Sequence, residues 1–99
     1  MTLIISLEIE KKLLRKHNVS KQEVIDCFAN RDGEFLIEDR EEHKTDPQTH
    51  WFIAETDMGR KLRVYFVPRT NDDGGIDICL KTALNPKQHH IDTYNEKAY

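Results

Sequence analysis

The hydrophobic pattern of the chain changes its period at the turn formed by residues 30–33, Asn-Arg-Asp-Gly. Before this turn apolar residues recur at the spacing of helices, and after it they alternate with polar residues as in strands. Helices followed by a run of strands are typical of the α+β class. Because 99 residues suffice for one core but not for two, we predict a single domain over residues 1–99.

The N-terminal third carries the start signals of two helices. Its predicted elements are a short strand over residues 2–5, a helix from Leu7 to His17 and a helix from Lys21 to Ala29. Ser6 is placed to cap the first helix, and Ser20 with Glu23 forms a capping box at the start of the second. The ring of His17 is expected to bond the last carbonyls of the first helix.

Alternating strands fill most of the remaining chain. The predicted elements are strands from Glu34 to Glu38, Trp51 to Thr56, Leu62 to Val67 and Ile76 to Leu80, and a short helix opened by Asn85 and Pro86. Pro68 is expected to end the third of these strands. We therefore predict two N-terminal helices packed on one face of an antiparallel meander, followed by a short C-terminal helix.

The hairpin around Gly59 decides which face of the sheet each strand residue occupies. A type I turn with Gly59 in a bulge pairs Thr56 with Arg60, whereas a two-residue turn exchanges the two faces of the preceding strand. We favour the bulge, because it does not force Met58 into a left-handed conformation. The bulge places Phe52, Ala54, Leu62, Val64 and Phe66 in the core. It places Trp51, Glu55, Arg63 and Tyr65 together on the open face.

Charge, cysteine and histidine usage restrict the compartment and the cofactors. The net charge is −3, yet residues 11–21 and 60–69 are basic without any acid, which allows a local positive surface. The two cysteines form no CxxC pair and no apolar run reaches the length of a membrane span, so a cytoplasmic location is expected. The adjacent His89 and His90 are expected to point apart on a helix, and no histidine spacing indicates a metal site. No cofactor is expected.

Two segments, KHNVS at 16–20 and GRKLRVYFVPR at 59–69, resemble those of the BrnT toxins, which belong to the RelE-like toxin group of type II toxin–antitoxin systems. The similarity follows the order of the elements over nearly the whole chain. It implies a helix pair packed on an antiparallel sheet, a metal-independent ribonuclease activity, and a cognate antitoxin that covers the basic sheet face. These toxins tend to end the last strand with Ser-Ala-Arg; here the stretch is CLKTALNP, and Lys81 is the nearest cation.

Metal-free cleavage of RNA needs a general base, a general acid and cations that stabilise the charge of the phosphorane. His43 is the candidate acid or base, since an imidazole titrates near neutral pH. Arg69, which matches the family, and Arg40 from the charged loop are the candidate catalytic cations. Two alternatives stay open: His43 can lie in a solvated loop, and Arg69 can cap the turn that follows Pro68.

RNA binding is expected on the sheet face that carries Arg63. Arg63 and Lys81 can hold phosphate, and Tyr65 or Trp51 can stack on a base of single-stranded RNA. The alternatives are that Arg63 pairs with an acid of a neighbouring strand and that Trp51 packs within the sheet.

The predicted function is a toxin-like ribonuclease that acts on RNA, with a cognate antitoxin as partner and a homodimer as a further assembly to test. The alternative is a non-catalytic protein that binds a partner through the same scaffold. The net charge and the missing arginine favour the alternative, whereas the basic run over 60–69 and the nearby His43 favour the nuclease. The nuclease requires Arg40, Arg63 and Arg69 to converge on one face.

Overall fold

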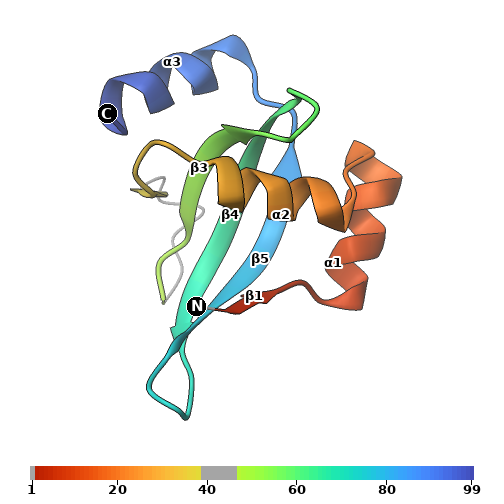
Figure 1. The fold of residues 1–99 in the computed structure, drawn as a ribbon, viewed down its shortest axis with the longest axis vertical. Helices are drawn as coiled ribbons and strands as arrows, with labels where there is room; N and C mark the ends of the chain where they lie inside the picture. Colours follow the sequence, from red (N-terminus) through yellow and green to blue (C-terminus); the bar gives the residue numbers. More distant parts are fainter. Residues whose placement is uncertain (1, 39–46) are drawn as a thin grey trace.

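The computed structural model of the chain describes residues 2–38 and 47–99. Over these residues the fold is α+β, with three helices and a five-stranded mixed sheet (Figure 1). The elements are β1 (Thr2–Ile4), α1 (Leu7–Lys12), η1 (Leu13–His17), α2 (Lys21–Asn30), β2 (Leu36–Ile37), β3 (His50–Glu55), β4 (Lys61–Thr70), β5 (Ile76–Leu84) and α3 (Gln88–Lys97). The segment η1 is a π-helical continuation of α1.

Both predicted helix caps are confirmed. The hydroxyl of Ser6 accepts a hydrogen bond from the backbone N–H of Ile9, at 3.2 Å. At the start of α2, the hydroxyl of Ser20 accepts from the N–H of Glu23 at 3.1 Å, and the Glu23 carboxylate accepts from the N–H of Ser20 at 3.0 Å. Each cap satisfies backbone donors that have no partner inside the helix, which fixes where the helix begins.

The strand order in the sheet is β1-β5-β4-β3-β2. The pairs from β2 to β5 are antiparallel, as predicted, but β1 pairs with β5 in parallel. The sheet is therefore mixed, and the prediction of a wholly antiparallel sheet was wrong at this edge. The direction of a three-residue edge strand follows from the path of the two helices after it, which no local pattern specifies.

The hairpin between β3 and β4 has the predicted geometry. The N–H of Thr56 donates to the carbonyl of Arg60 at 2.8 Å, and Gly59 has φ +86°, in the region that glycine adopts most readily. Glu55 then pairs with Lys61 in the ladder. The predicted core residues of the two strands are buried: Phe52, Ala54, Leu62, Val64 and Phe66.

The strands β4 and β5 are longer than predicted. The ladder continues past Pro68, which pairs with Ile78, and β5 runs to Leu84. The pairing with β3 ends at Phe66, so in the described residues β4 has only β5 as a neighbour at Pro68. A proline fits there because one edge of the strand needs no N–H donor.

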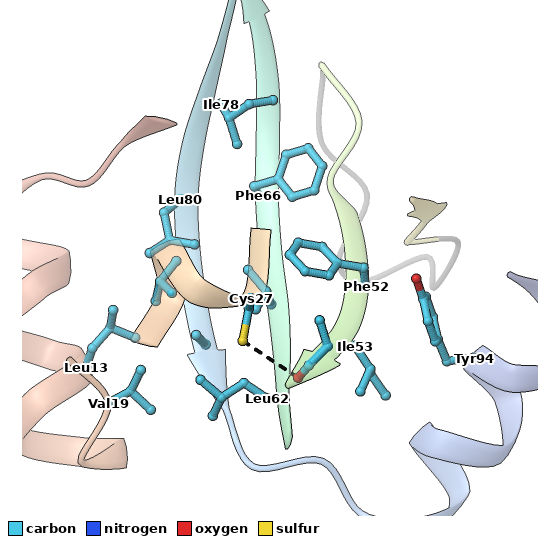
Figure 2. Close-up of a cluster of buried hydrophobic side chains, with 14 of the residues drawn as sticks. Leu13, Val19, Cys27, Phe52, Ile53, Leu62, Phe66, Ile78, Leu80 and Tyr94 are labelled. Atoms are coloured by element: carbon cyan, nitrogen blue, oxygen red, sulfur yellow. Dashed lines mark hydrogen bonds between the residues drawn. The ribbon is translucent and has the colours of Figure 1, made fainter. Parts of the chain in front are cut away.

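The hydrophobic core lies between the sheet and the N-terminal helices. Figure 1 shows α2 lying across the front of the sheet, and Val24 and Cys27 of α2 are fully buried together with Leu13 of η1. In Figure 2 the thiol of Cys27 points toward the end of β3, where it donates to the carbonyl of Ala54 at 3.6 Å. An aromatic cluster fills the other end of this core: Phe28, Phe35, Phe52 and Phe66.

Helix α3 lies against the opposite face of the sheet, at the end where the β3–β4 hairpin turns. Tyr94 anchors it: this side chain is 2% exposed, its ring is 5.6 Å from that of Trp51, and its hydroxyl donates to the carbonyl of Glu34 at 2.8 Å. The face predicted to be open is therefore partly covered. What remains accessible is bounded by α3 on one side, and this boundary shapes the candidate site.

Candidate functional site

Three elements bring polar side chains together on the partly covered face. The alternation of β4 places Arg63 and Tyr65 on this face, and the guanidinium Nη1 of Arg63 donates to the Tyr65 hydroxyl at 3.3 Å. The register between β4 and β5 shifts at Tyr65 and Phe66, so that Lys81 is the extra residue of a bulge. A bulge turns its extra side chain out of the regular alternation. Lys81 Nζ reaches Thr49 Oγ1 at 3.4 Å.

A cavity of about 330 Å³ lies over these side chains. It is lined by Glu38, Thr49, Arg63, Tyr65, Lys81, Thr82 and Leu84. We call it the cationic cavity, because among the described residues its charged lining is two cations, Arg63 and Lys81, and one acid, Glu38. Within residues 2–38 and 47–99, Arg63 Nε is the one buried side-chain nitrogen or oxygen that lacks a hydrogen-bond partner. A buried donor without an acceptor costs about 1–3 kcal/mol, so an anion that reached it would be favoured.

His90 of α3 completes this group. Its Nε2 lies 2.7 Å from Arg63 Nη1, and its Nδ1 lies 3.1 Å from the backbone N–H of Lys87. A neutral imidazole has one acceptor nitrogen, so it can accept only one of these two hydrogen bonds at a time. The ring therefore stands between two donors and satisfies one of them. An acceptor that displaced the direct contact between His90 and Arg63 would relieve this competition.

A second cavity, of about 230 Å³, adjoins the first. It is lined by Leu36, Ile37, Glu38, Trp51, Tyr65, His89, His90, Thr93 and Lys97. We call it the aromatic cavity, because the rings of Trp51 and Tyr65 lie nearly parallel there, 6.1 Å apart with an angle of 18°. Glu38 and Tyr65 line both cavities, so the two lie side by side along the sheet face.

The rings of His89 and His90 lie 4.0 Å apart, so the prediction that they point away from each other was wrong. Successive residues of a helix diverge by about 100° around its axis, but an imidazole can turn back from that direction. Both rings consequently face the aromatic cavity. Over the described residues there is still no group of three histidine, cysteine or acidic side chains that could hold a metal ion.

The other predicted site residues are not brought to this face. Arg69 is exposed on β4, opposite Asp77 of β5. Six residues of strand, at about 3.3 Å each, separate it from Arg63, which is about 20 Å. Arg69 and Arg63 therefore cannot hold the same phosphate, so the convergence expected of these two arginines is not met and a nuclease site on this face has to be built on Arg63 without Arg69. The predicted catalytic residues Arg40 and His43 lie outside the described residues.

The predicted alternatives for Arg63 and Trp51 have different outcomes. Arg63 contacts His90 and Tyr65, not Glu55, whose carboxylate lies 3.8 Å from Lys61. Trp51 does pack within the sheet face, against Tyr65 and Tyr94, yet it also lines the aromatic cavity.

Arg60, the first cation of the basic run over residues 60–69, is bound inside the protein. It donates to the backbone carbonyls of His17 and Asn18, at 3.1 and 2.8 Å, and to the side chain of Asn85. Within the described residues, Arg60 therefore satisfies carbonyls at the end of the first helix. The ring of His17 had been predicted to do so. Asn18 ends this helix in a left-handed conformation, with φ +52°.

Sequence reasoning missed His90, Glu38 and Thr49 as members of the site. His90 had been considered only as a metal ligand, and Glu38 only as the end of a strand. A signal for His90 existed: Ile91 and Tyr94 form the apolar side of α3, and a helix that buries them brings the adjacent residue 90 against the sheet. No local signal indicated on which face α3 would pack.

A larger cavity of about 550 Å³ lies on the other side of α3. Its charged lining is mainly acidic, with Asp32, Glu55 and Asp57 against one cation, Lys61. An acidic wall repels phosphate, so this cavity does not suit the predicted ligand.

A scan of the chain against protein-family models gives no match, and none of the curated proteins is similar enough to count as a relative. In the described parts of the chain, no helix is both long and apolar enough to cross a membrane.

Proposed function

We propose that this protein is a toxin-like, metal-independent ribonuclease of a type II toxin–antitoxin pair, and that its active site is the sheet face between β4, β5 and α3. One observation carries the proposal: Arg63 Nη1 lies 2.7 Å from His90 Nε2, beside a cavity that also presents Lys81 and the Tyr65 hydroxyl. An imidazole next to two cations and a phenol is the set of groups that metal-free phosphodiester cleavage needs.

The proposed roles follow from the positions of the donors. A phosphate oxygen that displaces the direct contact of Arg63 with His90 accepts from both, which relieves the competition of two donors for one imidazole. Lys81 neutralises the same phosphate from the bulge of β5. His90, with its proton on Nε2, then gives that proton to the leaving 5′-oxygen, and solvent water accepts the proton of the 2′-hydroxyl. General acid–base help of this kind contributes about 10²–10⁴-fold in rate, and a donor to the developing charge about 10²–10³-fold.

Single-stranded RNA is the substrate that this face favours. The rings of Trp51 and Tyr65 provide an aromatic surface beside the cations, and stacking of a base on such a surface contributes about 1–3 kcal/mol. The mechanism uses the 2′-hydroxyl as nucleophile, so DNA would bind but not be cleaved. In this proposal the protein acts in the cytoplasm, and an antitoxin inhibits it by covering the cationic cavity.

The second candidate is a non-catalytic protein that binds a partner through the same face. A specific observation favours it: the guanidinium of Arg63 is already held by His90 and Tyr65, as in a structural network that fixes α3 to the sheet. A non-catalytic protein also needs no positively charged site for RNA, which agrees with the net charge of −3.

Regulated expression in a bacterial host separates the two candidates. Wild type is compared at matched protein levels with Arg63→Ala and His90→Ala, and with Arg15→Ala as a control that removes an exposed cation of η1. The nuclease predicts growth arrest with loss of cellular RNA, relieved by the first two substitutions and not by the third. Normal growth on expression of wild type would contradict it. His43→Ala and Arg69→Ala, tested in parallel, show whether either residue also contributes.

A further inference from the structure

We infer that the exposed side of α1 and η1 is a docking surface for an acidic amphipathic helix of a partner protein. We call it the α1–η1 surface and define it by Leu7, Lys11 and Leu14. None of these three residues lines the cationic or the aromatic cavity. The inference therefore goes beyond the proposed function, and it does not depend on cleavage of RNA.

The α1–η1 surface carries two leucines in line. Leu7 is 65% exposed and Leu14 is 52% exposed, and among the residues that the structure describes they are the only exposed leucines. Seven residues are close to two helical turns, so both side chains leave the helix on one side. Figure 1 shows this helix beside β5 and β1, and its other side buries Leu13 in the core. Covering the two leucines removes apolar area from water, which favours a partner with apolar side chains of its own.

The same side of the helix carries positive charge. Lys11 follows Leu7 by four residues and precedes Leu14 by three, so helical spacing places it between the two leucines. It begins the basic run over residues 11–21, which contains no acid, and the two acids of α1 lie in its first turn. Over the described residues, no ion pair involves a cation of α1 or η1. Charge complementarity then favours a partner with carboxylates beside its apolar residues.

The backbone beneath Leu14 has a rare conformation. Leu13–His17 form a π-helix, which is rare in proteins and occurs frequently at functional sites. Its end is fixed, because Asn18 closes the turn in a left-handed conformation and Arg60 holds the carbonyls of His17 and Asn18. A surface held in one conformation loses little entropy when a partner binds. The π-helix is thus a second observation that points to a binding role for this side of the helix.

A helix of another protein fits these features better than RNA or a membrane does. An RNA backbone would use the cations and leave the leucines exposed, since phosphates offer no apolar contact. A bilayer needs a continuous apolar face on the helix that lies in it, whereas here Lys11 separates the two leucines. A helix with apolar residues one and two turns apart and carboxylates beside them matches both the leucines and the charge.

Binding of a synthetic peptide tests the α1–η1 surface directly. The probe is a fluorescently labelled peptide of about 18 residues, or about five helical turns, with leucines at helical spacing and glutamates beside them. One control peptide has glutamine in place of every glutamate, and another has serine in place of every leucine. By fluorescence anisotropy, we expect the full-length protein to bind the probe about tenfold or more tightly than either control, because each control lacks one complementary feature.

Leu14→Ser and Lys11→Glu locate the peptide on the protein. Both positions are exposed, so the melting temperature should stay close to that of wild type, while each substitution should weaken peptide binding about tenfold. Lys97→Glu is the control for charge reversal, since Lys97 is exposed on α3, and it should leave binding unchanged. In nuclear magnetic resonance spectra of labelled protein, the amide shifts caused by the probe should cluster at residues 7–17.

A probe that binds no more tightly than its glutamine and serine controls would overturn the inference. Peptide binding that Leu14→Ser and Lys11→Glu both leave unchanged would overturn it as well. Binding of an RNA oligonucleotide or of phosphatidylglycerol vesicles that Lys11→Glu abolishes, without binding of the peptide, would assign the surface to another ligand and contradict the inference. Growth arrest and RNA cleavage are measured without the peptide, so failure of the proposed function and failure of the docking surface are distinguishable.

Discussion

The guanidinium of Arg60 contacts both carboxylate oxygens of Glu23, at 3.2 and 3.1 Å, across 37 residues of sequence. Burial would raise the pKa of Glu23, but the N–H of Ser20 and the charge of Arg60 outweigh it and lower that pKa. Glu23 thus both caps α2 and binds Arg60, which follows the turn of the β3–β4 hairpin. Because Arg60 also holds the end of the first helix, this pair joins two helices to the sheet.

Arg60→Lys should destabilise the protein by about 1–3 kcal/mol, because an ammonium cannot reproduce the planar set of hydrogen bonds that Arg60 makes. Urea unfolding measures the change. Lys61→Gln is the control, since the Lys61–Glu55 pair is half exposed and 3.8 Å apart, and it should change stability by less than about 1 kcal/mol. Equal losses for the two substitutions would show that Arg60 is an ordinary surface cation.

Gly33→Ala should loosen α3. A Cβ at Gly33 would lie 2.7 Å from the hydroxyl oxygen of Tyr94 and 3.0 Å from the Cβ of Ala98, both in buried positions. Overpacking of this kind costs about 1–3 kcal/mol. Near-ultraviolet circular dichroism and thermal unfolding report the loss. Gly59→Ala meets no neighbour within 4 Å and is strained only by its φ of +86°, so it should lower stability without altering the tyrosine signal.

Alkaline pH should destabilise the fold from about pH 9 upward. Burial, together with the charges of Asp26 and Glu23, raises the pKa of Cys27 from 9.0 to about 12, and burial raises that of Tyr94 from 10.0 to about 12. At a pH between its ordinary and its raised pKa, each of these groups ionises only in the unfolded state. The stability that the two groups contribute is therefore complete below pH 9 and falls as pH rises. The slope is about 1.4 kcal/mol per pH unit for each such group.

Unfolding by urea at pH 8, 9, 10 and 11 checks this dependence. Cys27→Ala lowers stability at every pH because it leaves a small cavity, but its stability should fall less steeply between pH 9 and 10. Parallel curves for wild type and Cys27→Ala would contradict the raised pKa of the thiol.

The parts of the fold that the sequence predicts are those set by local chemistry. The caps at Ser6 and Ser20 and the bulge at Gly59 each depend on a few neighbouring residues, and all three are confirmed. The bulge in turn fixes which strand residues enter the core. The parallel pairing of β1 and the position of α3 depend instead on contacts between distant segments, such as Tyr94 with Glu34, and no short pattern encodes these.

The same division applies to the candidate site. Arg63, Tyr65 and Trp51 were expected on one face, and they line two adjoining cavities there. This could be predicted because alternation along a strand assigns faces. His90 could not, because its place follows from the packing of α3 on that face. Arg69 shares the alternation of Arg63 but lies too far along β4, since alternation gives the face and not the distance.

Binding of RNA should depend only modestly on salt. Two cations, Arg63 and Lys81, line the cationic cavity, and each phosphate neutralised on a single strand contributes about −0.7 to the slope of log K against log salt. Because the two cations hold one phosphate, we expect a slope of about −0.7 for wild type and a slope closer to zero for Lys81→Ala, measured by fluorescence anisotropy of a labelled oligonucleotide. A slope that Lys81→Ala leaves unchanged would place the bound phosphate elsewhere.

In the proposed function, the face formed by Arg63 and His90 cleaves RNA without a metal. The most direct test incubates purified protein with a labelled RNA oligonucleotide in excess EDTA, beside the same oligonucleotide with 2′-deoxy sugars. We expect cleavage of the RNA alone, reduced about 10²-fold or more by His90→Ala and by Arg63→Ala and unaffected by Arg15→Ala. Intact RNA with wild type, or equal cleavage by wild type and His90→Ala, would contradict it.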